Sequence, residues 1–207
     1  MGSHLRYWGV APERIVELDW WGSKTVGSVT ITCTPARHFS GRGFSQNSTL
    51  WAGWAITSSE HRVFYSGDTA MFPGFVEIGD RLGPFDLAMV EVGAYDALWS
   101  DVHLGPEQAV RAARLVRAKT LLPVHWGLFD LALHAWTEPM ERVLVAAKRE
   151  GMRVLTPPPG GSVEPTLSST VVKWWPDLPY RTFEEAPANS TSVDELNGDR
   201  YAPPWPN

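Results

Sequence analysis

Hydrophobic and polar positions alternate with a period of two in the first third of the chain, a pattern typical of strands. We expect strands over residues 14–22 and 28–35, and Pro35 ends the second of them. Two further runs, residues 48–59 and 61–67, flank a short polar turn and predict a hairpin. The first part of the chain is therefore predicted to consist of strands.

From about residue 73 the pattern changes to helical stretches, recognised by apolar positions on one face, separated by short apolar runs that indicate strands. The expected helices span residues 73–83, 105–118 and 137–151. The expected strands span residues 85–92, 120–126 and 152–156. Strands that are followed by alternating strand and helix units predict an α/β fold in which helices cover a sheet.

The composition changes after Pro157, where Pro, Ser and Gly become frequent. We therefore divide the chain into a folded part, residues 1–157, and an appended segment, residues 158–207, that ends from about Ala186 in a loose, disordered tail. Within the appended segment, residues 171–180 contain a Trp pair that is expected to dock onto the folded part.

Composition and charge exclude several classes of protein. Of the 207 residues, 43% are hydrophobic and 20% are charged, as in an ordinary globular protein. The net charge is −5 and no block of Lys and Arg stands out, so no nucleic-acid partner is expected. The longest apolar candidate, residues 120–129, is interrupted by Pro123 and His125 and is shorter than the roughly 18–20 residues of a membrane span. Cys33 is the only cysteine, which fits a reducing compartment, and we expect a cytoplasmic protein.

Three polar residues lie just past the ends of predicted strands, namely His38, Asp68 and His125. Ligand sites of α/β sheets gather at the carboxyl ends of strands, and imidazole and carboxylate groups are zinc ligands. The three residues together therefore predict a metal site. For each residue alone an ordinary role stays open, which is a turn or cap for Asp68, a core position for His125 and a loop position for His38.

Seven short motifs follow one another within residues 5–157. They are ELDWW (17–21), TPARHFSGR (34–42), LWAGWAI (50–56), FYSGDT (64–69), GPFDLAMVEVGAY (83–95), VHLGPEQAV (102–110) and VHWGLF (124–129). In this order they resemble the metallo-β-lactamase-fold hydrolases, and among these the N-acyl-phosphatidylethanolamine-hydrolysing phospholipase D enzymes and their bacterial relatives. The resemblance implies an αββα sandwich of which this chain supplies mainly the second half, a mixed sheet with covering helices. It also implies a phosphodiesterase that uses two zinc ions and acts on N-acyl-phosphatidylethanolamine or a related organic phosphate.

The resemblance assigns roles to individual residues. By it, His38 would complete one zinc site, His125 would bind a second zinc ion, and Asp68 would bridge the two ions and hold the nucleophilic hydroxide. His103, just before the helix expected from residue 105, matches a family histidine near the substrate phosphate, to which it would donate a hydrogen bond or a proton. A helix cap or a solvent-exposed position stays open for His103.

Four aromatic residues are candidates for an apolar substrate groove near His125. They are Trp99, Trp126, Phe129 and Trp136. A place in the hydrophobic core is an equally good interpretation of each. A lipid-like phosphodiester would fit such a groove, and peripheral contact with a membrane stays open for the same reason.

The first ligand motif of the family, His-x-His-x-Asp-His, is absent, because no two of the six histidines are two residues apart. The chain is therefore expected to begin partway through the fold. We expect it either to self-associate through an apolar sheet face or to need a missing N-terminal half. Besides the phosphodiesterase, a lactonase, a nuclease of the same fold and a non-catalytic half-domain that needs a partner stay open.

Overall fold

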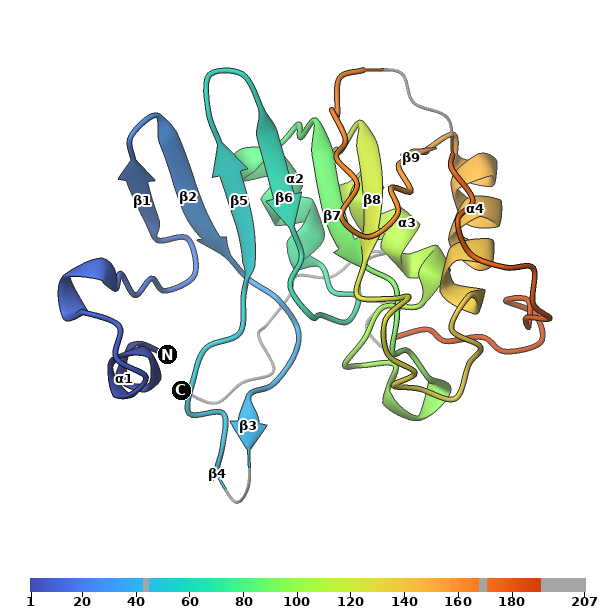
Figure 1. Cartoon of the computed structure of the whole chain (residues 1–207), viewed down its shortest axis with the longest axis horizontal. Helices are drawn as coiled ribbons and strands as arrows, with labels where there is room; N and C mark the ends of the chain where they lie inside the picture. The colour runs from blue at the N-terminus through green and yellow to red at the C-terminus, as the bar shows by residue number, and fades with distance from the viewer. Residues whose placement is uncertain (43–44, 168–170, 191–207) are drawn as a thin grey trace.

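The computed structural model describes residues 1–42, 45–167 and 171–190 and contains a seven-stranded mixed sheet (Figure 1). The strands, in their order across the sheet, are β1 (Ser23–Val26), β2 (Val29–Thr34), β5 (Gly53–Thr57), β6 (Arg62–Tyr65), β7 (Leu87–Glu91), β8 (Thr120–Val124) and β9 (Arg153–Val154). Pairing is antiparallel from β1 to β6 and parallel from β6 to β9. The carboxyl ends of β2, β6, β7 and β8 therefore lie at one edge of the sheet.

Three helices pack on one side of the sheet; in Figure 1 the first two lie behind the strands and the third stands to the right, beside β9. They are α2 (Gly74–Leu82), α3 (Pro106–Leu115) and α4 (Glu138–Glu150). Both α3 and α4 have a proline in the first turn, where a missing N–H costs no hydrogen bond. The short elements are α1 (Gly2–Tyr7), η1 (Pro12–Arg14), β3 (Gly41–Arg42), β4 (Ser45–Gln46) and η2 (Ala97–Trp99). No helix among the described residues is long and apolar enough to cross a bilayer.

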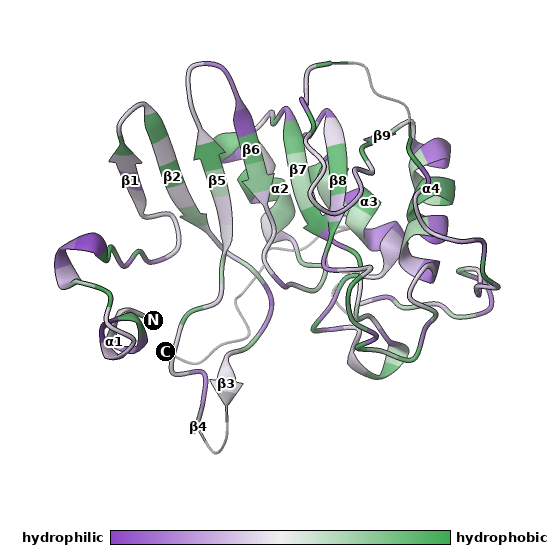
Figure 2. Ribbon diagram, in the orientation of Figure 1, coloured by the Kyte–Doolittle hydropathy of each residue, from purple (hydrophilic) through white to green (hydrophobic). Residues whose placement is uncertain are grey.

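The hydrophobic core lies between the sheet and these helices. The register places Phe64, Ala88 and Leu121 side by side on β6, β7 and β8, and each is at most 1% exposed. Ile78 of α2 and Val143 of α4 belong to the same buried cluster. Full burial of a side chain such as Phe64 or Leu121 stabilises the fold by about 1.5–3 kcal/mol. Figure 2 shows a hydrophobic β7 in the sheet and, beyond β9, an α4 on which hydrophilic and hydrophobic turns alternate.

The other face of the sheet is also apolar, and within the described ranges no helix covers it (Figure 1). Tyr65, Met89 and Leu122 are neighbours on this face, and Ile56 and Val63 continue it toward β2. Ile56 is 38% exposed and Tyr65 is 36% exposed, whereas the other three are half-buried. In an αββα sandwich this is the face that a second sheet would cover.

Most of the expected elements are confirmed between residues 28 and 156, with shorter ends, and so is the α/β class with a mixed sheet. The strand expected over residues 14–22 is wrong, because its start falls in η1 and the chain then turns at Trp21, whose φ is 69°. The strand beside β2 is instead β1. All four residues of β1 are exposed, so no alternation of buried and exposed positions marks it in the sequence.

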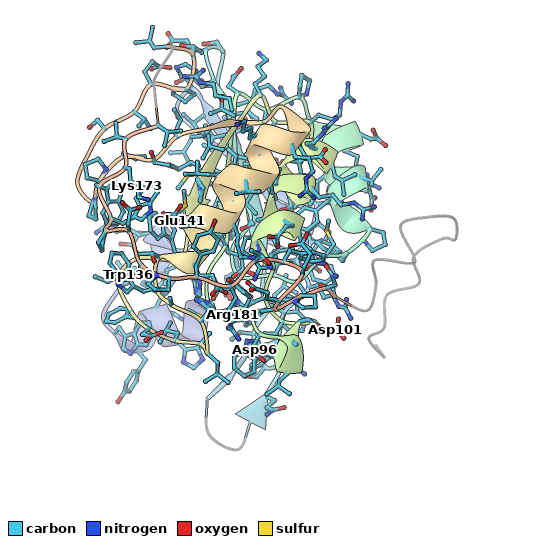
Figure 3. All side chains as sticks on the ribbon, turned by 90° about the vertical axis from the view of Figure 1, so that its right-hand side faces the viewer. Asp96, Asp101, Trp136, Glu141, Lys173 and Arg181 are labelled. Carbon is cyan, nitrogen blue, oxygen red and sulfur yellow. The ribbon has the colours of Figure 1, made fainter. Side chains whose placement is uncertain are left out.

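Residues 171–190 pack along the helical side of the molecule, and this segment contains the Trp pair, Trp174 and Trp175. Trp175 is 3% exposed and Trp174 packs against the core cluster, which confirms the expected docking. Nζ of Lys173 lies 2.6 Å from Oε1 of Glu141 on α4, and Figure 3 shows the two side chains together.

The end of the described segment is also held in place. Ser190 is 3% exposed, its Oγ donates to the carbonyl oxygen of Ser100 at 2.7 Å, and it accepts from the amide of Met71 at 3.0 Å. The packed chain therefore extends past Ala186, where the loose tail was expected to begin. The rest of that expected tail, residues 191–207, lies outside the described residues.

Candidate functional site

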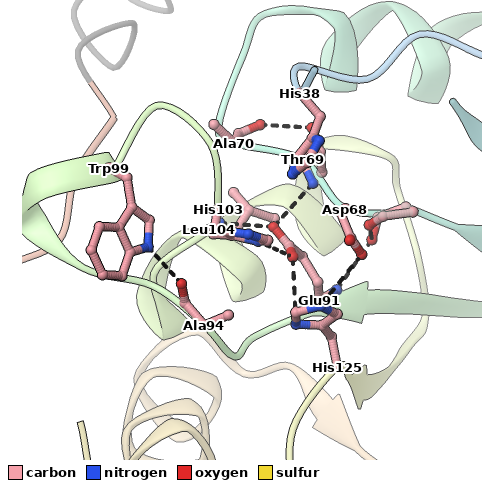
Figure 4. Close-up of polar contacts among 12 residues, drawn as sticks. His38, Asp68, Thr69, Ala70, Glu91, Ala94, Trp99, His103, Leu104 and His125 are labelled. Carbon is pink, nitrogen blue, oxygen red and sulfur yellow. Dashed lines mark hydrogen bonds and ion pairs between the residues drawn. The ribbon is translucent and has the colours of Figure 1, made fainter. Parts of the chain in front are cut away.

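Four side chains from distant parts of the sequence meet at the carboxyl edge of the sheet (Figure 4). His38 follows β2, Asp68 follows β6, His125 follows β8 and His103 precedes α3. Nε2 of His125 lies 3.6 Å from Oδ1 of Asp68. The centroid of the His103 ring lies 5.2 Å from that of His38 and 5.3 Å from that of His125. The structure thus brings the three expected metal ligands and the expected substrate histidine to one place.

The backbone around the site is tightly constrained. Gly67 has a φ of 61°, and a Cβ there would lie 2.4 Å from the carbonyl oxygen of Ala52, so the residue before Asp68 has to be glycine. His125 itself has a φ of 65°, a left-handed conformation that is rare and costly for residues other than glycine. Such conformations cluster at functional sites, because the surrounding structure has to hold them.

Glu91, the last residue of β7, is a fifth member of the site that we did not expect from the sequence. The side chain is fully buried, and its Oε2 lies 2.8 Å from Nδ1 of His103 and 3.9 Å from Nδ1 of His125. Glu91, His103 and His125 each offer one ligand atom, and these atoms lie within 4.8 Å of one another. The signal that could have revealed Glu91 is a single carboxylate in the apolar run LAMVEV (87–92), since a buried charge needs partners.

Burial and hydrogen bonding shift the pKa values of Glu91 and His103 in opposite directions. Burial raises the pKa of Glu91, and the hydrogen bond and positive charge of His103 lower it by less. Burial lowers the pKa of His103, but the hydrogen bond and negative charge of Glu91 outweigh that effect, so the pKa of His103 is raised. The imidazolium form of His103 is therefore favoured by its position next to a buried carboxylate.

The free nitrogen atoms of the other histidines fit a metal ion. Nδ1 of His38 donates to the carbonyl oxygen of Phe39 at 2.8 Å, so Nε2 carries the lone pair. Nε2 of His38 is buried and has no hydrogen-bond partner among the described residues, and Nε2 of His125 faces Oδ1 of Asp68 at 3.6 Å. A buried nitrogen without a partner is costly, and imidazole nitrogens beside an aspartate are zinc ligands. His38, Asp68 and His125 therefore fit a divalent transition metal such as zinc.

A cavity of about 400 Å³ opens beside His125. Its walls include Leu122 from β8, Met140 from α4, and Trp126, which stacks on Trp174 with ring centroids 5.0 Å apart. These walls are mainly apolar, so the cavity suits a hydrocarbon or aromatic group.

The other three aromatic residues expected in a substrate groove lie outside this cavity. Trp99 donates from Nε1 to the carbonyl oxygen of Ala94 at 2.7 Å and holds the loop after β7 (Figure 4). Phe129 is 71% exposed. Trp136 is half-buried, with its ring centroid 6.5 Å from that of Trp174. Of the four, Trp126 is the one that the structure places on the wall beside His125.

Comparisons with known proteins agree with this geometry. Residues 1–126 match the family model described as the beta-lactamase superfamily domain. The chain is 49% identical over 178 residues to an uncharacterized protein of Mycobacterium tuberculosis, which covers 84% of this chain and 48% of that protein. It is 37% identical over 138 residues to an N-acyl-phosphatidylethanolamine-hydrolyzing phospholipase D of Caenorhabditis elegans, which covers 62% of this chain and 39% of that enzyme.

The fold has a match among solved structures. A metallo hydrolase from Ignicoccus hospitalis superposes with a TM-score of 0.55 at 21% identity and covers 73% of this chain and 60% of that one. This likeness concerns the fold. The chain spans about half the length, or less, of the Mycobacterium tuberculosis and Caenorhabditis elegans relatives. Because the family model covers well over half of the 207 residues, the chain belongs to the beta-lactamase superfamily, the proteins of the metallo-β-lactamase fold.

Proposed function

We propose that the site at the carboxyl edge of the sheet serves the metal-dependent hydrolysis of a phosphodiester, in the manner of a phospholipase D. The observation that carries the proposal is the meeting of Asp68 and His125, 3.6 Å apart, at an edge where the His38 ring, with an unpartnered Nε2, lies 5.2 Å from the His103 ring. One carboxylate and two imidazole groups form a donor set for zinc. Two zinc ions are what the family resemblance implies for the complete site.

His38, Asp68 and His125 would hold the metal. When bound, zinc supplies an activated water and stabilises negative charge on the phosphate oxygens. The side chain of Asp68 is 44% exposed and so is open to substrate. The side chains of Glu91, His103 and His125 are more buried. The carboxylate of Asp68 would also orient the attacking water by accepting a hydrogen bond from it.

His103 would act on the substrate. Hydrolysis of a phosphodiester adds water across a P–O bond and gives a phosphomonoester and an alcohol, and the leaving alkoxide needs a proton. The imidazolium of His103, which the carboxylate of Glu91 favours at 2.8 Å, supplies a proton or a hydrogen bond to that oxygen. His103 is half-buried at the site, which leaves it within reach of a bound phosphate.

The substrate class follows from the cavity and from the relatives. The apolar cavity beside His125 suits an acyl chain. Relatives at 37% and 30% identity carry the name of N-acyl-phosphatidylethanolamine-hydrolyzing phospholipase D. We therefore propose N-acyl-phosphatidylethanolamine or a similar lipid-like phosphodiester, which the protein would meet at a lipid surface.

An assay with added zinc tests the proposal. The chain lacks the His-x-His-x-Asp-His motif, so we expect slow hydrolysis of N-acyl-phosphatidylethanolamine in mixed micelles, dependent on zinc and abolished by Asp68→Asn. His61→Ala is the matched control, because His61 lies at the start of β6, away from the site. Faster cleavage of a lactone or of tRNA would favour a lactonase or a nuclease. Hydrolysis that is equal in wild type and Asp68→Asn would contradict the proposed site.

A further inference from the structure

Glu91 holds different partners with its two carboxylate oxygen atoms. Oε1 accepts hydrogen bonds from the backbone amides of Thr69 and Leu104, both at 3.0 Å. Oε2 lies 2.8 Å from Nδ1 of His103. Because the Glu91 side chain is fully buried, rotation of the carboxylate would leave two amide groups without partners and without water. The orientation of the carboxylate is therefore fixed by the backbone.

We infer that Glu91 is a positioning residue that keeps the proton of neutral His103 on Nδ1, so that Nε2 is the nitrogen that meets a substrate or a metal. An ionised carboxylate oxygen only accepts hydrogen bonds, so Nδ1 has to donate. In a histidine, the hydrogen bond made by one ring nitrogen decides the state of the other. An imidazole with no such partner would be free to exchange between the two tautomers.

The same carboxylate also connects His103 to the loop that carries Asp68. Thr69, whose amide binds Oε1, follows Asp68 directly in the sequence. The amide of Glu91 in turn donates to Oγ of Ser66, at the start of that loop, at 3.1 Å. One buried side chain thus sets the ring orientation of His103 and the position of the backbone beside Asp68.

Glu91→Gln tests the inference because glutamine has nearly the same shape. Its amide oxygen keeps the place of Oε1, where two backbone amides require an acceptor, so its NH₂ group has to face Nδ1 of His103. That group donates, Nδ1 has to accept, and the imidazole proton moves to Nε2. We therefore expect ¹⁵N NMR of histidine-labelled protein, at about pH 9 where histidines are neutral, to show Nε2 unprotonated in the wild type and Nδ1 unprotonated in the variant.

Asp86→Asn is the matched control. Asp86 precedes β7 at the other end of the strand, where it accepts from the amide of Arg62 at 3.0 Å and from Nζ of Lys119 at 2.9 Å. This variant should leave the tautomer of His103 unchanged. An unprotonated Nδ1 in the wild type would overturn the inference, and this result does not depend on whether Glu91→Gln folds. A folded Glu91→Gln protein whose His103 keeps its proton on Nδ1 would overturn it too.

The hydrolytic activity of Glu91→Gln is a second measurement, and its interpretation rests on the proposed function. If His103 serves hydrolysis, Glu91→Gln should lower kcat about 10–100-fold, in the range found for residues that support a metal site from the second layer, with KM and zinc content nearly unchanged. A tautomer change with unchanged kcat would support the positioning by Glu91 and contradict the role proposed for His103. A fall in kcat without a tautomer change would overturn the positioning.

Discussion

The backbones of Gly93 and His125 approach so closely that a Cβ on residue 93 would stand 2.0 Å from the carbonyl oxygen of His125. Gly93 lies two residues after Glu91, in the loop that follows β7, and His125 follows β8 in a left-handed conformation with a φ of 65°. The contact leaves no room for a side chain at residue 93. It ties the unusual backbone of a proposed metal ligand to the neighbouring strand.

Gly93→Ala should therefore displace His125. We expect an affinity for zinc that is lower by about tenfold or more, as when a support of a metal ligand is lost, and a protein less stable by about 1–3 kcal/mol, as for other overpacked sites. Calorimetric titration with zinc and thermal unfolding measure the two effects. Gly151→Ala is the control, because a Cβ at residue 151 meets nothing within 4 Å, so it should cost stability through its φ of 65° alone and leave zinc binding unchanged. Zinc affinity equal to that of the wild type in Gly93→Ala would show that the contact does not position His125.

His103→Ala should separate substrate chemistry from metal binding. Removing a proton donor should lower turnover about 100-fold or more, while zinc content measured by atomic absorption stays at the level of the wild type. His61→Ala should change neither quantity. A His103→Ala protein that is purified without zinc would instead identify His103 as a ligand or as the support of one.

The apolar face of the sheet that no described helix covers, which includes Ile56 and Val63, should cause the protein to self-associate. Ile56 is 38% exposed beside half-buried apolar neighbours, and apolar surface of this kind is normally covered. Ile56→Lys should shift sedimentation velocity profiles toward the monomer at equal concentration. Val145→Lys is the matched control, because Val145 is 52% exposed on α4, on the opposite side of the sheet. If the wild type sediments as a monomer at all concentrations, this face does not mediate association.

Cys33 should react slowly with alkylating reagents while the protein is folded. The side chain is 1% exposed, and burial raises the pKa of its thiol to about 11. A raised pKa means less thiolate at any pH below it, so at about pH 8.5, the usual pKa of a free cysteine, the folded protein should be alkylated much more slowly than the urea-unfolded chain. Mass spectrometry of iodoacetamide-treated samples measures the rates. Equal rates would show that β2 is not packed as described.

Helices and strands with a strong periodic pattern could be predicted from the sequence because each of them buries one face. That His38, Asp68 and His125 converge could be predicted for a related reason, since each follows a strand whose carboxyl end lies at the same edge. Glu91 could not be predicted in the same way. In the sequence, Glu91 is one polar position in a strand that is otherwise apolar. Its partners Thr69, His103 and Leu104 cannot be inferred from a local pattern, because they are 12 to 22 residues away.

Long-range packing accounts for the other differences. Ser190 is buried against Met71 and Ser100, which no local pattern in a Pro- and Ser-rich segment indicates. The fully exposed β1 has no apolar side to reveal it. For the aromatic residues, composition cannot separate Trp126, on the wall of the cavity, from Phe129, which is exposed to solvent.

The location of bound zinc tests the central claim most directly. Crystals of the protein grown with zinc, with anomalous data collected at the zinc absorption edge, would place the ion without any assumption about activity. We predict a peak at roughly 2.0–2.2 Å from the carboxylate of Asp68 and from Nε2 of His125. A strong peak only elsewhere, for example beside His61 and Glu164, whose Nε2 and Oε1 are 3.8 Å apart, would contradict a metal site at the carboxyl edge of the sheet.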